Sequence, residues 1–316
     1  MRGPRWLRGL APWVVAALVV GLLVWRYSPR AIAAELARGS VLAILPWCAA
    51  VSLVSLVLMS LADWLVFASA LGAGDRLRVT DAARGRAATS ILMSINYGLS
   101  SGGYGVWLAR RTGSGAAAAV GATTYQVLSD LGAVFLFALP AALLGADLLP
   151  ARIGQSAAIV AAFGAVGVTV LLVAAPRVAP RRLRESRVLV AWARVPIAVG
   201  ALGALLRAGS IAANIAGTWG AARAFGLDIP GEALAAGLPI AYLVGALPVN
   251  VLGLGAVQAA WLVLFAAHAP GAQMLAFQFA FQLQSVLVMV LRGLPFLPGV
   301  MRDLQQPPAA TPASGG

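Results

Sequence analysis

Charge is scarce in this sequence, and most of it is positive. Charged residues make up 10% of the 316 positions, whereas soluble domains carry about a quarter. Lysine does not occur, so all 23 basic residues are arginine, against 10 acidic residues and one histidine. So few carboxylates and imidazoles leave little for acid–base catalysis, and we expect the chain not to be an enzyme.

Cysteine is nearly absent as well. Cys48 stands alone, which excludes an intramolecular disulfide and any cysteine metal cluster. The simplest interpretation of this residue is a small apolar side chain within a helix. We therefore expect neither a metal nor a cofactor.

Apolar residues are what the sequence has in abundance. They form 61% of the chain and occur in runs long enough to cross a bilayer, for which a helix needs roughly 20 residues. We predict an all-α polytopic membrane protein with about six full spans and two re-entrant broken helices arranged as an inverted repeat. Residues 1–304 would form a single integral membrane domain, and the Pro/Ala/Ser/Gly-rich residues 305–316 a disordered tail.

The expected spans are residues 12–25, 41–71, 116–144, 153–174, 199–225 and 274–291. Residues 31–38 and 188–195 are expected to form short helices at the membrane surface. The broken elements are residues 80–111 and 233–267. Three spans separate them, so they would enter the membrane from opposite faces.

The arginines predict the orientation of the chain. The net charge of +13 is concentrated at the ends of apolar runs, where the positive-inside rule places cytoplasmic loops. This rule places both termini in the cytoplasm and accounts for the basic charge without nucleic acid as a partner. We expect the membrane to be a bacterial cytoplasmic membrane. The densest cluster comprises Arg177, Arg181, Arg182, Arg184 and Arg187.

The two broken elements predict a binding site. Residues 96–105 and 247–255 combine glycine with asparagine, serine or proline, residues that favour non-helical backbone. Backbone released from helical bonding cannot face lipid, so we expect both breaks to meet in a polar pocket. The alternative is that the glycines only allow tight helix packing.

Polar side chains at helical spacing add to this prediction. Gln126 and Asp130 are four residues apart, as are Gln278 and Gln282. Asp63, Asp130 and Arg207 are ionisable residues within apolar segments, where such groups usually pair or line a path. Interhelical hydrogen bonding is the alternative for each, and Arg207 could instead snorkel to the interface.

The predicted substrate site is the sum of these residues. It comprises Asn96, Ser101, Gly102, Gly103, Gly105, Gln126, Asp130, Asn250, Gly253, Gly255, Gln258, Gln278 and Gln282, with Asp63 and Arg207 as charge partners.

Two motifs resemble the lysylphosphatidylglycerol synthase transmembrane family. In the first half an Asn-Tyr segment at Asn96 runs into glycines, followed by Ala109-Arg110-Arg111-Thr112-Gly113 and by Asp130 in the next helix. In the second half, Leu247-Pro248-Val249-Asn250 leads to Gly253-Leu254-Gly255, which is similar to a Pro-x-x-x-G-x-G motif of that family. Many members carry an acid where this chain has Gln258. The resemblance implies a flippase-like protein that moves a lipid or lipid-linked headgroup between leaflets.

Two function classes follow. The first is a lipid flippase whose partners are membrane lipids. The alternative is a non-catalytic membrane subunit or scaffold that presents lipid or docks a cytoplasmic enzyme on the loop of residues 177–187, or that assembles with a second copy of the chain. A third interpretation, an ion or small-solute carrier, would make Asp130 a proton site.

Overall fold

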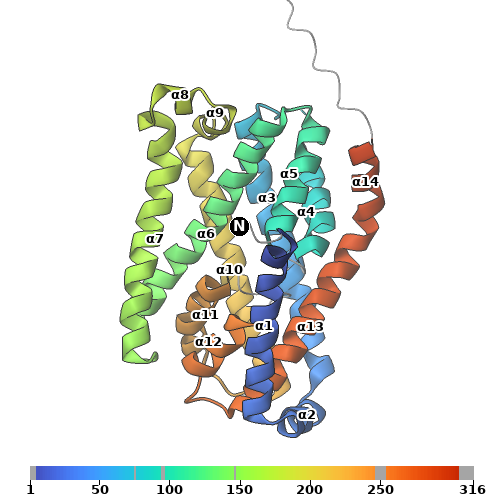
Figure 1. Cartoon of the computed structure of the whole chain (residues 1–316), viewed down its shortest axis with the longest axis vertical. Helices are drawn as coiled ribbons and strands as arrows, with labels where there is room; N and C mark the ends of the chain where they lie inside the picture. Colours follow the sequence, from blue (N-terminus) through green and yellow to red (C-terminus); the bar gives the residue numbers. More distant parts are fainter. Residues whose placement is uncertain (1–4, 75, 94–96, 146, 246–253, 306–316) are drawn as a thin grey trace, which may run out of the picture. The chain divides into compact units, whose positions relative to one another are not determined.

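The chain is an all-α polytopic membrane protein. The computed structural model describes residues 5–74, 76–93, 97–145, 147–245 and 254–305, and these are helical almost throughout (Figure 1). Five helical segments are long and apolar enough to cross a membrane: Val41–Leu71, Ala116–Leu144, Ile153–Val178, Ile197–Phe225 and Gly271–Gln305. They contain α3 (Leu45–Leu71), α6 (Ala116–Leu144), α7 (Ala151–Val178), α10 (Ile197–Phe225), and α13 (Gly271–Gly293) with α14 (Leu297–Gln305).

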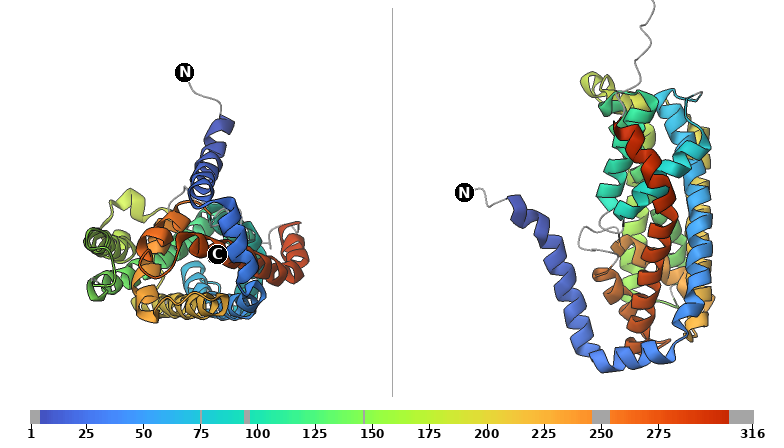
Figure 2. Two further views of the ribbon diagram at one scale, coloured as in Figure 1. Left: turned by 90° about the horizontal axis from the view of Figure 1, so that it is seen from below. Right: turned by 90° about the vertical axis from the view of Figure 1, so that its right-hand side faces the viewer.

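A sixth span is available at the N-terminus if a bent pair of helices counts as one. Helices α1 (Arg5–Tyr27) and α2 (Pro29–Arg38) meet at 81°, a turn that is plain in Figure 2. Ser28 stands between them with φ of +63°, and Pro29 follows it as the first residue of α2, a position where proline is tolerated. We predicted about six full spans, and the structure has five, or six if the bent pair counts as one span; the short helix expected after the first span is present as α2.

The chain divides into two compact units, each assembled from three sequence segments. Unit 1 contains residues 1–53, 134–163 and 211–288, and unit 2 contains residues 54–133, 164–210 and 289–316. Each unit has a hydrophobic core of its own. The predicted tail from residue 306 onward lies outside the described residues.

The core of unit 1 is aromatic. Phe277 packs against Phe225 and Trp261, with ring centroids 5.7 Å apart in both pairs, and Trp261 meets Phe265 edge-on at 4.8 Å. Between helices in a membrane such packing is the main source of stability, because lipid is as apolar as the side chains themselves. These rings join α10, α13 and α12 (Ala256–Leu264).

Unit 2 is built around a second aromatic group. Tyr104 stacks on Trp107 at 5.8 Å and meets Phe67 edge-on at 5.3 Å. Phe67 belongs to α3, whereas the other two residues belong to α5 (Tyr97–Thr112). The surface helix α9 (Arg187–Ala193) is held on α6 by Trp192, whose indole N–H donates to the carbonyl of Gly121 at 2.7 Å.

Each unit contains a pair of apposed helices too short to span a membrane. In unit 2 these are α4 (Val79–Met93) and α5, of 15 and 16 residues (Figure 1). In unit 1 they are α11 (Gly231–Gly245) and α12, of 15 and 9 residues. A 16-residue helix is about 24 Å long, short of the roughly 30 Å hydrocarbon core, so no member of either pair spans a membrane unaided.

Most of the first predicted break is helical. We expected irregular backbone over residues 96–105, but α5 begins at Tyr97 and includes Gly102, Gly103 and Gly105. That expectation is wrong for these glycines, and at Gly103 and Gly105 a close side-chain neighbour accompanies the helical backbone. A Cβ on Gly105 would lie 3.2 Å from the side chain of Thr123 on α6. Asn96, predicted as a site residue, lies outside the described residues.

Candidate functional site

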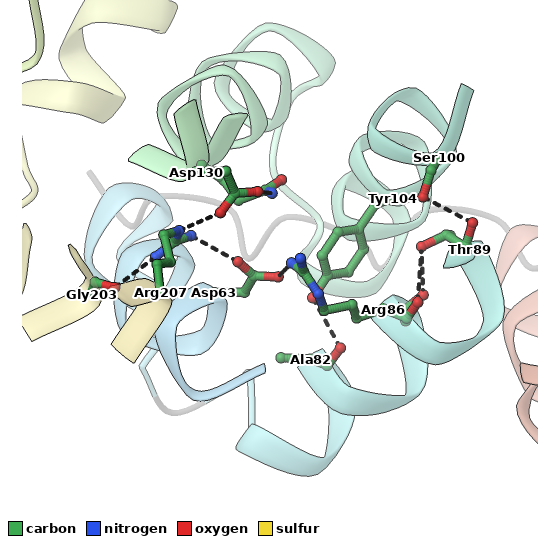
Figure 3. Close-up of polar contacts among 11 residues, drawn as sticks. Asp63, Ala82, Arg86, Thr89, Ser100, Tyr104, Asp130, Gly203 and Arg207 are labelled. Atoms are coloured by element: carbon green, nitrogen blue, oxygen red, sulfur yellow. Dashed lines mark hydrogen bonds and ion pairs between the residues drawn. The ribbon is translucent and has the colours of Figure 1, made fainter. Parts of the chain in front are cut away.

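Asp63 is the centre of a polar network inside unit 2. It lies on the apolar helix α3, and none of its side chain is exposed. Its Oδ1 accepts a hydrogen bond from Arg207 Nη2 at 2.9 Å, and its Oδ2 accepts one from Arg86 Nη1 (Figure 3). A carboxylate in such an environment is tolerated only when its charge and lone pairs are both met.

Arg207 joins Asp63 to a second carboxylate. Its Nε donates to Asp130 Oδ1 at 2.5 Å, and its Nη1 donates to the carbonyl of Gly203, one turn earlier on α10, at 3.3 Å. Only 1% of the Arg207 side chain is exposed. The alternative that Arg207 snorkels to the membrane interface is therefore wrong, and the guanidinium points into unit 2 (Figure 3).

Asp130 and Gln126 form the end of the network on α6. Gln126 Nε2 donates to Asp130 Oδ2 at 2.6 Å, as their spacing of four residues predicts for one helix face. The Oε1 atom of Gln126 is buried and has no hydrogen-bond partner among the described residues. The amide nitrogen is the atom that faces Asp130, because an ionised carboxylate only accepts hydrogen bonds.

Arg86 is a network member that the sequence analysis missed. It falls within the predicted broken element of residues 80–111 and is not singled out there, but it lies in the middle of α4 and reaches Asp63. No local pattern in the sequence separates it from the neighbouring arginines. Tyr104 lies beside the network, and its hydroxyl donates to the carbonyl of Ala82 at 2.9 Å (Figure 3).

The four charges of the network sum to zero, and two of its four charged side chains are partly exposed. It contains two carboxylates and two guanidiniums. The side chains of Asp63 and Arg207 are 0% and 1% exposed, whereas those of Arg86 and Asp130 are 19% and 15% exposed. Arg86 and Asp130 are therefore the two charged members of the network that are not fully enclosed.

The structure also brings α4 and α5 together around polar contacts. Ser100 Oγ on α5 donates to the carbonyl of Thr89 on α4 at 2.9 Å, and Thr89 Oγ1 donates to the carbonyl of Gly85 at 2.8 Å (Figure 3). Near the first helical turn of α4, Asp81 pairs with Arg111 at 2.9 Å. Ser101 is half-buried on α5, and no contact ties it to the network.

In unit 1 only some of the predicted site residues are among those that the structure describes. Gly255 has φ of +125° directly before α12, and its N–H donates to Gln258 Oε1 at 2.6 Å. Gln258, predicted to line a binding site, therefore caps the helix. Gln278 is buried with Nε2 lacking a partner among the described residues, and Gln282 is half-buried. Asn250 and Gly253 lie outside the described residues.

No three His, Cys, Asp or Glu side chains come together as a metal site within the residues that the structure describes. In the network itself, all four oxygens of Asp63 and Asp130 accept hydrogen bonds from Arg86, Arg207 or Gln126. These oxygens accept charge-assisted hydrogen bonds from guanidinium and amide groups, an arrangement that suits the binding of polar or charged groups better than the coordination of a metal.

Comparison with protein-family models, curated proteins and solved structures gives no match for this chain. The resemblance to the lysylphosphatidylglycerol synthase transmembrane family is therefore a hypothesis that rests on the quoted motifs alone.

Proposed function

We propose that this protein is a lipid transporter that moves a phospholipid or lipid-linked headgroup between the leaflets of a bacterial cytoplasmic membrane. The observation that carries the proposal is the neutral network of Asp63, Arg86, Asp130 and Arg207, buried among apolar helices of unit 2. Ionisable groups inside a membrane protein usually mark a substrate or ion path.

Stability alone is a weak explanation for this network. A buried ion pair often contributes no more than a well-packed apolar pair, because the two charges lose their hydration. Here four such groups come from α3, α4, α6 and α10, and two of them are partly exposed. A polar headgroup that exchanges hydrogen bonds with Arg86 or Asp130 would explain why those two are not sealed.

The neighbouring helix pair supports the same proposal. Helices α4 and α5 are too short to cross a membrane, and Arg86 lies on one of them. Broken helices beside an intramembrane polar site are a recurrent feature of transporters. The further expectation that both breaks meet in one pocket stays a prediction, because residues 94–96 and 246–253 lie outside the described chain.

The proposal is tested with purified protein in liposomes that contain fluorescent phosphatidylglycerol, with a membrane-impermeant quencher reporting the outer leaflet. We expect Asp130→Asn and Arg86→Gln to slow translocation by about tenfold or more, since each removes a charge-assisted hydrogen bond. The matched control is Arg111→Gln, which breaks the ion pair between the partly exposed Arg111 and the buried Asp81 on the same two helices.

Wild-type rates in all three variants, with folding verified by size exclusion and thermal unfolding, would contradict the proposal. A loss that is equal in the control variant would do the same, because it would show that only the packing of α4 and α5 matters.

The scaffold function has an observation of its own in its favour. Helix α8 (Arg181–Arg184) is exposed, and its ion pair to Glu185 leaves the Arg181 side chain 86% exposed. A scaffold that docks an acidic cytoplasmic partner here predicts that Arg181→Gln with Arg182→Gln releases the partner while Asp130→Asn has no effect. The transporter predicts the reverse, so one pair of variants separates the two functions.

A further inference from the structure

The surface helix α9 of unit 2 lies against the first turns of α6 (Figure 1). A Cβ on Gly121 would lie 2.8 Å from the carbonyl oxygen of Val188, and Trp192 donates to the carbonyl of Gly121. A Cβ on Gly115, directly before α6, would lie 2.9 Å from Arg187 Nη1. Since α6 is one of the long apolar segments, these contacts place Arg187 where a span begins, which is the level of the lipid headgroups.

The short helix α8 is held at the end of a second span, α7. It begins three residues after α7 ends at Val178, and it contacts α9. Arg184 Nη1 donates to the carbonyl of Arg177 at 3.3 Å, and Arg177 Nη1 donates to the carbonyl of Val173. These two arginines therefore satisfy carbonyl groups that the end of a helix leaves without an intrahelical partner.

Two other arginines of this turn are available to an anion. Residues 177–187 contain five arginines and one acid, a net charge of +4. Arg181 pairs with that acid, Glu185, at 2.7 Å. Arg182 and Arg187 are exposed and make no ion pair with any residue that the structure describes.

Exposed apolar side chains stand beside these arginines. Val178 is 77% exposed and Leu183 is 56% exposed, and Leu183 directly follows Arg182. Basic residues interleaved with exposed apolar ones are typical of segments that lie in the headgroup region of an anionic membrane. An acidic soluble partner would account for the arginines but not for the two apolar side chains next to them.

We propose that residues 178–187 form a docking surface for anionic phospholipids of the adjacent leaflet. Arg182 and Arg187 bind lipid phosphates, which guanidinium groups match with two parallel hydrogen bonds. Val178 and Leu183 enter the acyl region beside the end of α7. This surface is distinct from the network around Asp63, and it does not depend on the proposed transport.

The test asks which lipid touches position 183 in the full chain. Cys48 is replaced by alanine, and Leu183→Cys is labelled with bimane, an apolar fluorophore. The protein is reconstituted in vesicles of equal parts dioleoylphosphatidylcholine and dioleoylphosphatidylglycerol, with a quenching doxyl group on the acyl chain of one lipid or the other. We expect phosphatidylglycerol to be preferred by about fivefold or more, because one basic residue near an anionic surface contributes about that factor.

Substitutions identify the groups responsible for the preference. Arg182→Gln with Arg187→Gln should reduce it to about one, meaning no preference, whereas lysine at both positions should retain most of it. High salt should weaken it in the unsubstituted protein, since exposed charges are screened. Arg76→Gln with Arg78→Gln removes two exposed arginines elsewhere in unit 2. This matched control should keep the preference unchanged.

Equal quenching by the two lipids in the labelled protein would overturn the proposal, as would an equal loss of preference in the control variant. Acrylamide, a neutral quencher dissolved in the water, provides the remaining outcome. A fluorophore that acrylamide quenches and neither lipid does would place residue 183 in the aqueous phase. That result would also overturn the lipid surface and would favour an acidic protein as the partner of these arginines.

Discussion

At the scale of single residues, the two carboxylates of the network have different roles. Asp63 is fully enclosed and shared between Arg86 and Arg207, whereas Asp130 is partly exposed and contacts Arg207 and Gln126. Removing Asp63 leaves the buried guanidinium of Arg207 and the partly exposed one of Arg86 without their common partner. Removing the charge of Asp130 leaves Arg207 still paired with Asp63.

This difference predicts unequal costs for the same chemical change. Asp63→Asn should destabilise the protein by about 3–5 kcal/mol, the usual penalty for breaking a buried pair. Asp130→Asn should cost about 1–2 kcal/mol, because an asparagine oxygen still accepts a hydrogen bond. Thermal unfolding in detergent measures both.

The double variant Asp63→Asn with Arg86→Gln provides the control. It removes one charge of each sign, so we expect it to be more stable than Asp63→Asn alone. Additive losses would show that the two residues do not act as a pair.

Sequence alone predicts part of this network and not the rest. Asp130 and Gln126 could be found because both lie on one helix at a spacing of four. The pairing of Asp63 with Arg207 joins residues 144 positions apart, and no local pattern encodes it. Arg86 was missed because it lies close in sequence to Arg76, Arg78 and Arg84, and the positive-inside rule already explains such a cluster. Of these four arginines, Arg86 is the one that contacts Asp63.

At the scale of elements, the glycines of α4 and α5 determine how closely the two helices pack. Gly85 faces the rings of Trp107 and Tyr104, where a Cβ would lie 2.6 and 2.8 Å from ring carbons. Gly102 has no atom within 4 Å of its Cβ position. Sequence analysis could not separate these glycines, because the neighbour that decides the matter comes from another part of the chain.

The two positions predict opposite effects of the same substitution. Gly85→Ala should destabilise the protein by about 1–3 kcal/mol, as overpacking does in well-packed cores. Gly102→Ala should be neutral or stabilise it by up to about 1 kcal/mol, since alanine is the better helix former. Thermal unfolding of the matched pair decides the point, and equal effects would contradict the packing seen here.

The start of α12 gives a second prediction at this scale. Gly255 has a positive φ, which glycine adopts readily and other residues rarely do. The side chain of Gln258 accepts a hydrogen bond from the N–H of Gly255. Gly255→Ala should therefore cost about 1–3 kcal/mol through strain, and Gln258→Ala about 1 kcal/mol through loss of the cap. Faster amide exchange over Ala256–Leu264 in both variants would confirm this; unchanged exchange would contradict it.

At the scale of the whole molecule, long apolar runs determine the fold, and this is why the sequence predicted it well. The predicted span 116–144 coincides with α6, and the predicted span 41–71 with the segment that contains α3. Helices α7 and α13 extend a few residues beyond the predicted spans 153–174 and 274–291 at both ends.

The orientation of these spans is open to a direct test that Cys48 makes convenient. Cys48 is only 3% exposed, so it should resist maleimide in the folded protein. With Cys48 replaced by alanine, Asp147→Cys and Arg182→Cys at opposite ends of α7 should label from opposite sides of the membrane. We expect the residue at 182 to react from the cytoplasmic side; labelling of both from one side would contradict the topology.

The neutrality of the Asp63–Arg86–Arg207–Asp130 group has an electrical consequence. A membrane voltage does work of about 2.3 kcal/mol per elementary charge per 100 mV, but it does none on a group whose charges sum to zero and that moves as one body. Moved as one body, these four side chains would therefore contribute no gating current of their own. If the protein moves lipid as proposed, the voltage would act on an anionic lipid, which would carry current, whereas a zwitterionic lipid would cross silently.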